Sequence, residues 1–242
     1  MLHILVKEIN GFLNSLIAYV VISVFLTAIG LLMWVFPDTS VLGYGYAEMS
    51  TLFTLGPYVL MFLTPAITMR MFAEEKKSGT LEFLFTKPLT DWDIILGKFI
   101  SSWLLVGFAI APTILYYVTL HQLSSPVGNI DTPGIAGSYI GLLLLGGLFT
   151  SIGILSSSIT SNQIVAFVIA VFGCFIFYSG FDALSGLSMW AAYSNFIEQL
   201  GITYHYNAMS KGLLDSRNLL YFGSAIALIL LLTKTKLGSR KW

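Results

Sequence analysis

The chain has 242 residues, of which 56% are hydrophobic and only 10% are charged. Soluble domains carry about 25% charged residues, and a core of this size could not hide so much apolar surface. The composition therefore excludes an ordinary soluble domain and predicts a protein embedded in lipid. The formal net charge is zero, so no overall bias toward nucleic acid is expected. Because Cys174 is the only cysteine, an internal disulfide is excluded and a zinc site is not expected.

Residues 2–16 have two chemically distinct sides. We expect an amphipathic helix lying on the membrane surface, although a plain cytoplasmic extension of the first span is the alternative. The polar side holds His3, Lys7, Asn10 and Asn14, and the apolar side holds Leu2, Leu5, Ile9, Phe12, Leu13 and Leu16. No Ala-x-Ala cleavage site follows the apolar stretch, so we expect it to be retained rather than removed as a signal peptide.

Six stretches are long and apolar enough to cross about 30 Å of hydrocarbon as helices. They are residues 16–36, 51–72, 94–120, 135–158, 164–181 and 216–233. The sequence thus predicts an all-α integral membrane protein, with residues 1–242 forming a single transmembrane domain.

Three of these features carry further expectations. Pro57 and Pro65 should kink or locally open the second span. Glycines should give the fourth span a side for close packing; they are Gly141, Gly146, Gly147 and Gly153. Residues 182–215 are too mixed for a span and predict a re-entrant helical hairpin at the outer interface, with Trp190, Tyr193, Tyr204 and Tyr206 at the headgroups.

The basic residues indicate the orientation. With six spans, one side receives ten of them: Lys7, Arg70, Lys76, Lys77, Lys87, Lys98, Lys234, Lys236, Arg240 and Lys241. The other side receives only Lys211 and Arg217, whereas the acidic residues divide evenly. The positive-inside rule therefore places both termini in the cytoplasm.

Motifs for catalysis are absent from the sequence. It contains no phosphate-binding Gly-x-x-x-x-Gly-Lys-Ser/Thr loop, no Gly-x-Ser-x-Gly and no His-Glu-x-x-His. We therefore expect neither catalytic nor metal-ligating residues. No Asp or Glu lies at the predicted middle of a span, which argues against an ion-driven carrier, because such carriers bind ions with intramembrane carboxylates.

Residues 74–98, between the second and third spans, contain the only dense charge cluster, Glu74-Glu75-Lys76-Lys77. Thr80 is expected to cap a short amphipathic helix that ends before Pro88. Thr90 and Asp93 have the spacing of a capping box for the next helix. A short cytoplasmic helix of this kind is suited to docking a partner, but a solvated loop would have the same composition.

The same segment resembles the signature of permease subunits of type-2 ABC exporters. The resemblance is carried by Glu75, Gly79-Thr80-Leu81-Glu82, Lys87-Pro88-Leu89, Ile94 and Leu96-Gly97-Lys98, and the predicted layout agrees with it over the whole chain. Within that family the chain most resembles permeases of gliding-motility-associated ABC transporters, followed by those of copper-insertion clusters for nitrous oxide reductase.

The resemblance implies a multi-pass protein of the bacterial inner membrane that works with other chains. A separate ATPase would bind ATP and Mg²⁺, leaving this chain without cofactor, and would dock on a coupling helix. The docking residues are Glu75, Gly79, Thr80, Leu81, Glu82, Lys87 and Pro88. A second permease copy or a sister permease would complete a dimer, and an auxiliary membrane protein of the motility system is a further expected partner. Nucleic acid is not.

The resemblance also implies that the first, second and fifth spans line the transport path, which would open as the second and fifth spans tilt. The candidates are Tyr19, Ser23, Thr27, Thr64, Thr68, Phe167, Phe172 and Phe175. This apolar lining with scattered hydroxyls suits a lipid-linked or amphipathic substrate, or none. The alternatives are a scaffold that transmits ATP-driven motion to a secretion or periplasmic partner, a passive channel and, least favoured, a membrane enzyme.

Overall fold

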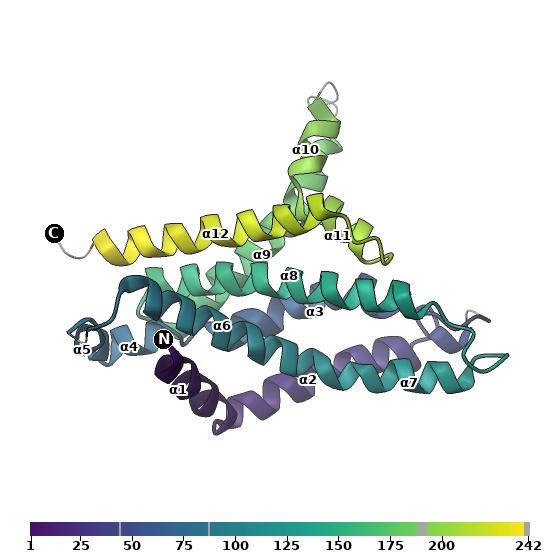
Figure 1. Ribbon diagram of the computed structural model, residues 1–242, viewed down its shortest axis with the longest axis horizontal. Coiled ribbons are helices and arrows are strands. Elements are labelled where there is room, and N and C mark those ends of the chain that lie inside the picture. Colours follow the sequence, from purple (N-terminus) through teal and green to yellow (C-terminus); the bar gives the residue numbers. More distant parts are fainter. Residues whose placement is uncertain (44, 87, 188–192, 240–242) are drawn as a thin grey trace.

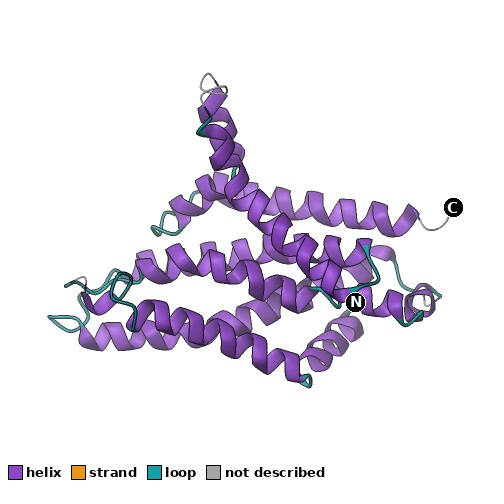
Figure 2. Cartoon of the chain, turned by 180° about the vertical axis from the view of Figure 1, so that it is seen from behind, coloured by secondary structure: helices purple, strands orange, loops and turns teal. Residues whose placement is uncertain are grey.

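The computed structural model describes residues 1–43, 45–86, 88–187 and 193–239. Within these ranges every regular element is a helix, as Figure 2 shows. Six helical stretches are long and apolar enough to cross a membrane, which confirms the predicted number for the described residues. They are α2 (Leu16–Trp34), α3 with α4 (Ser50–Lys77), α6 with α7 (Asp91–Leu123), α8 (Thr132–Ile159), α9 (Gln163–Ser185) and α12 (Ser216–Gly238).

Two of the spans are interrupted at places that the sequence did not specify. Helix α3 (Ser50–Thr68) is helical through both Pro57 and Pro65, and the break comes later, at residues 69–72. The third span divides into α6 (Asp91–Ile110) and α7 (Ile114–Leu123), joined by the 3₁₀ turn η2 (Ala111–Thr113). Pro112 lies in that turn, where its missing N–H interrupts the α-helical hydrogen bonds.

Helix α8 is the centre of the bundle. In its most apolar stretch 78% of the residues are buried, against 22% in α2 and in α9. It packs against α3, α6, α9 and α12 (Figure 1). Its glycines permit these contacts: a Cβ on Gly146 would lie 2.9 Å from Val106 of α6, and one on Gly147 would lie 3.1 Å from the Trp103 indole nitrogen. Close packing at the glycines is therefore confirmed, but they do not share one side of α8, because Gly141 faces Met209 of α11 and Gly153 faces Thr68 of α3.

Helix α1 (Leu2–Leu13), α4 (Ala73–Lys77), α5 (Thr80–Phe85) and the last turns of α12 gather at one end of the molecule (Figure 1). Helix α1 packs on α6 and buries Ile4 and Phe12. The loops that connect α2 to α3 and α7 to α8 lie at the opposite end. Both described ends of the chain are therefore on the same side of the bundle.

The segment before the last span contains two short helices, α10 (Ser194–Leu200) and α11 (Ile202–Met209). Helix α10 packs along α9 and projects away from the bundle, whereas α11 lies over α8 (Figure 1). Tyr193 and Tyr204 are exposed, but Tyr206 is buried and its hydroxyl donates to the Phe53 carbonyl at 2.7 Å. The expectation that Tyr206 lies at the lipid headgroups is wrong, because its hydroxyl finds a partner inside the protein. Trp190 lies outside the described residues.

Candidate functional site

The segment between the second and third spans, residues 73–86, forms a helical turn, and we call it the docking segment because the sequence predicts that a partner docks here. Helix α4 ends at Lys77 and α5 begins at Thr80, with Gly79 between them at a φ of 70°. Glycine adopts this left-handed conformation without the steric cost of a side chain. Gly79 therefore occupies the cap position of α5. The expectation that Thr80 caps α5 is wrong: Thr80 lies in the first turn, and its hydroxyl is 2.8 Å from that of Ser78.

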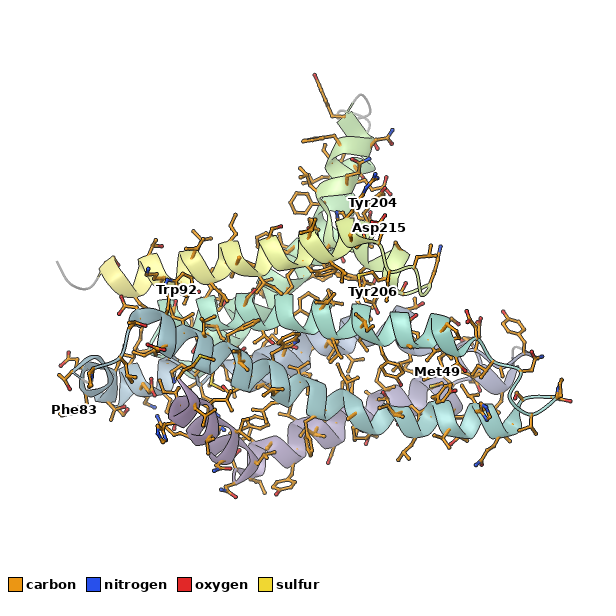
Figure 3. All side chains as sticks on the ribbon, in the orientation of Figure 1. Met49, Phe83, Trp92, Tyr204, Tyr206 and Asp215 are labelled. Carbon is orange, nitrogen blue, oxygen red and sulfur yellow. The ribbon has the colours of Figure 1, made fainter. Side chains whose placement is uncertain are left out.

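One side of this turn is buried and the other is free. Leu81 is 4% exposed and packs with Ile94 and Phe99 of α6. Glu82 is exposed, and Phe83 is 72% exposed at the far end of the molecule (Figure 3). The segment thus keeps an aromatic ring and a carboxylate available for a partner while Leu81 holds it to the bundle. Lys87 lies outside the described residues.

The start of α6 is fixed by a capping box. The Thr90 hydroxyl accepts a hydrogen bond from the Asp93 N–H at 3.1 Å, and the Asp93 carboxylate accepts one from the Thr90 N–H at 3.1 Å. These bonds satisfy backbone donors that a helix start leaves free. The capping box is confirmed, and it fixes the point at which the chain leaves the docking segment for the membrane.

Four charged side chains meet where α1, α4 and α6 converge. The Lys98 ammonium of α6 is fully buried and lies 2.7 Å from Glu8 of α1 and 3.1 Å from Glu75 of α4. Lys7 of α1 also contacts the same Glu75 oxygen, at 3.0 Å. Two positive and two negative charges therefore balance. A buried ammonium is tolerated only when it is paired and hydrogen-bonded in this way.

The edge of this charge cluster is open to solvent at Lys7. Burial alone would lower the pKa of the Lys7 ammonium, but the hydrogen bond and charge of Glu75, with the charge of Glu8, raise it above its usual value. Lys7 therefore stays positive at physiological pH. The positive charge of Lys7 balances one of the two carboxylates, Glu8 and Glu75, and the charge of Lys98 balances the other.

A cleft of about 480 Å³ separates α1 from the docking segment. Its walls mix apolar and charged side chains; they include Met1, His3, Lys7, Glu75, Phe83 and Pro88. Several sequence-predicted docking residues therefore line one cleft together with the start of α1. The contribution of α1 was not expected from the sequence.

The residues expected to line a path lie in different environments: some are exposed, one lines a groove and two are buried. Tyr19, Ser23 and Thr27 lie on the exposed side of α2, and Phe172 and Phe175 on that of α9. Phe167 lines a small apolar groove with residues of α2 and α3.

Thr64 and Thr68 are fully buried. The Thr68 hydroxyl donates to the Thr64 carbonyl at 2.9 Å, and its side chain occupies the space beside Gly153 of α8. In this conformation both threonines face the protein interior rather than an open surface.

Sequence reasoning missed Glu8 and the burial of Lys98. In the sequence, Glu8 is one of the evenly divided acidic residues, and Lys98 contributes to the positive charge of one side and to the family resemblance. The available signal was a lysine a few residues inside an apolar helix, since such a residue requires a carboxylate partner. The sequence did not indicate which one, because Glu8 is 90 positions away.

Comparison with known proteins identifies the family. Residues 38–235, which include the docking segment and five of the six spans, match the model of the ABC-2 family transporter proteins. The chain belongs to the ABC-2 transporter family. It is also 29% identical over 120 residues to the probable multidrug ABC transporter permease YbhR of Escherichia coli K12, and equally to that of strain O157:H7. That match spans half of this chain but 30% of the length of those permeases.

Membership of the ABC-2 family and the six candidate spans of the described residues are those of a multi-pass membrane protein. The turn formed by α4 and α5 combines the exposed side chains of Glu82 and Phe83 with the buried side chain of Leu81.

Proposed function

We propose that this permease couples ATP hydrolysis by a separate ATPase to export or to gliding-motility machinery. The ATPase, which would carry ATP and Mg²⁺, docks on α4, α5 and the residues that follow. Glu75, Gly79, Thr80, Leu81 and Glu82 shape this surface, and Lys87 and Pro88 continue it. Catalysis would reside on the partner chain.

The observation that carries this proposal is the arrangement of α5. It combines an exposed aromatic ring, Phe83, with an exposed carboxylate, Glu82, at the extreme end of the bundle. Leu81 on the same helix is buried against α6. A load on the exposed side would therefore reach a membrane-spanning helix directly, which a solvated loop could not achieve.

The proposed orientation puts the docking segment and both termini in the cytoplasm of a bacterial cell, with the protein in the inner membrane. Among the described residues this end carries Lys7, Arg70, Lys76, Lys77, Lys98, Lys234 and Lys236, and the positive-inside rule supports the assignment. Helix α1 would then lie at the membrane surface, with Leu2 72% exposed for contact with lipid.

The weakly buried helices support pairing with a second permease, either an identical copy or a sister chain. Helices α2 and α9 are the spans with the smallest buried fraction, and each presents large apolar side chains outward. Soluble proteins bury such faces, and a membrane protein covers them with lipid or with another subunit. The projecting hairpin of α9, α10 and α11 would meet the outer interface or the partner permease.

A path between the paired permeases would pass Tyr19, Ser23 and Thr27 of α2 and Phe167, Phe172 and Phe175 of α9. These aromatic rings with scattered hydroxyls suit an amphipathic or lipid-linked substrate. Thr64 and Thr68 would join the path only if α3 separated from α8 during the cycle, because both are now covered.

The motility assignment rests on the resemblance described above, and the rival is a scaffold that transmits motion without transporting anything. Both are tested by tagging the chain in its native membrane, solubilising it gently and identifying what co-purifies. We expect an ABC ATPase at near one copy per permease, and further chains that show the pairing and any motility partner. Absence of an ATPase even after mild crosslinking would overturn the proposal.

A further inference from the structure

The break between α3 and α4 has an unusual set of hydrogen-bond partners. Residues 69–72 form turns instead of regular α-helix. Some of their backbone groups bond locally, as the Met69 N–H does to the Pro65 carbonyl at 2.8 Å, and others take partners from neighbouring helices. Ser157 of α8 accepts hydrogen bonds from the N–H groups of Phe72 and Ala73, each at 3.0 Å, and donates to the Met69 carbonyl at 2.9 Å. One hydroxyl thus holds both sides of the break.

Lys98 of α6 completes this arrangement. Its ammonium group donates hydrogen bonds to the Met71 carbonyl and to the Glu8 carboxylate, each at 2.7 Å. It also lies 3.1 Å from the Glu75 carboxylate. An ammonium has three N–H donors, and three acceptors surround this one. The same side chain therefore ties the break to α1, through Glu8, and to α4, through Glu75.

A break between two helices can act as a hinge that absorbs motion. Here it is held from two other helices, and Lys98 has no exposed surface through which water could replace its bonds. Lys76 adds a further bond from α4 to the Ser158 carbonyl of α8. A displacement of α5 would consequently move α1, α6 and α8 together instead of bending residues 69–72.

We propose that Lys98 and Ser157 are positioning residues that lock the joint between α3 and α4, so that force from the ATPase reaches the outer end of the bundle. This inference rests on the proposed docking of an ATPase on α5. It gives Lys98 a role beyond the positive-inside rule. A lysine that only adds positive charge to the cytoplasmic side could be exposed and would need no buried partners.

The test uses the complex of the permease with the ATPase that co-purifies with it. A single cysteine is introduced at Val127, which is 72% exposed in the loop at the end opposite α5. The native Cys174 is buried and should remain unreactive. The rate at which a water-soluble maleimide modifies Val127→Cys is measured without nucleotide and with ATP plus vanadate. In the parent complex we expect a several-fold difference between the two states.

The decisive variant is Lys98→Met with Glu8→Gln, which removes the lock and leaves Glu75 paired with Lys7, so that no net charge remains buried. Ser157→Ala tests the other half of the joint. We expect both to retain the ATPase and its hydrolysis of ATP but to lose the nucleotide-dependent difference at Val127→Cys. The matched control is Lys236→Met, an exposed lysine on α12, which should keep the difference.

Three results separate the two proposals. A difference that persists in both joint variants would overturn the lock. Loss of ATPase binding in these variants, with binding intact in the parent, would also overturn it, because the joint would then be needed for docking rather than for transmission. Failure of the parent chain to bind any ATPase would instead overturn the proposed function.

Discussion

The ammonium nitrogen of Lys98 lies 2.7 Å from a carboxylate oxygen of Glu8, although the two residues are 90 positions apart in the chain. The contact joins the N-terminal helix to the third span beneath the docking segment. It explains how a lysine can be fully buried close to the start of an apolar helix, since the opposite charge and the Met71 carbonyl replace water.

The first prediction concerns the stability of this pair. Lys98→Met should destabilise the protein by about 3–5 kcal/mol, because removing one partner of a buried pair leaves an uncompensated charge. Adding Glu8→Gln should restore part of that loss. The measurement is the apparent melting temperature of the detergent-solubilised protein. It is read from the amount of protein that size-exclusion chromatography recovers after heating to each temperature. Equal melting temperatures for Lys98→Met and the parent would contradict the buried pair.

The second prediction concerns Gly153, where α8 approaches α3. A Cβ at this position would collide with the Thr68 side chain. Gly153→Ala should therefore cost about 1–3 kcal/mol through overpacking, and Thr68→Ala should relieve it in the double variant. Gly223→Ala in α12 is the control, because nothing lies within 4 Å of the new methyl group. The measurement is the melting temperature of these three variants and of the parent. A Gly153→Ala protein as stable as the parent would show that α3 and α8 are farther apart than the structure places them.

The third prediction concerns the attachment of α11 to the bundle. Tyr206→Phe leaves the buried Phe53 carbonyl without its donor and should cost about 1–3 kcal/mol. Burial raises the pKa of the Tyr206 hydroxyl well above its usual value, so the donor stays protonated at any physiological pH. We expect faster hydrogen exchange in residues 202–209 of the variant. Tyr204→Phe, at an exposed position, should leave exchange unchanged, and equal effects of the two substitutions would argue against the bond.

Local features of the fold were predictable from the sequence because they depend on neighbouring residues. The length of each apolar stretch gave the spans, and Thr90 with Asp93 gave the start of α6. The predicted N-cap of α5 was wrong by one residue. Threonine is a common cap, which favours Thr80, but the backbone turn requires a positive φ, which Gly79 adopts.

Relations between distant residues were not predictable. Nothing in the sequence links Lys98 to Glu8, or Ser157 to the break at residues 69–72, because these contacts depend on how the helices pack. The hydroxyl of Thr68 illustrates a second limit. A polar group in a span suggests a path, yet the Thr64 carbonyl one turn earlier satisfies it within the same helix.

The most direct test of the central claim measures how much ATPase co-purifies with the tagged permease carrying Gly79→Pro and Glu82→Arg. These substitutions alter the turn and reverse an exposed charge on α5. The control carries Gly45→Pro and Asp38→Arg at the opposite end, where Gly45 also has a positive φ of 75°. We expect the ATPase to be lost from the first variant and retained by the second. Retention by both, with the permease folded, would contradict docking on α4 and α5.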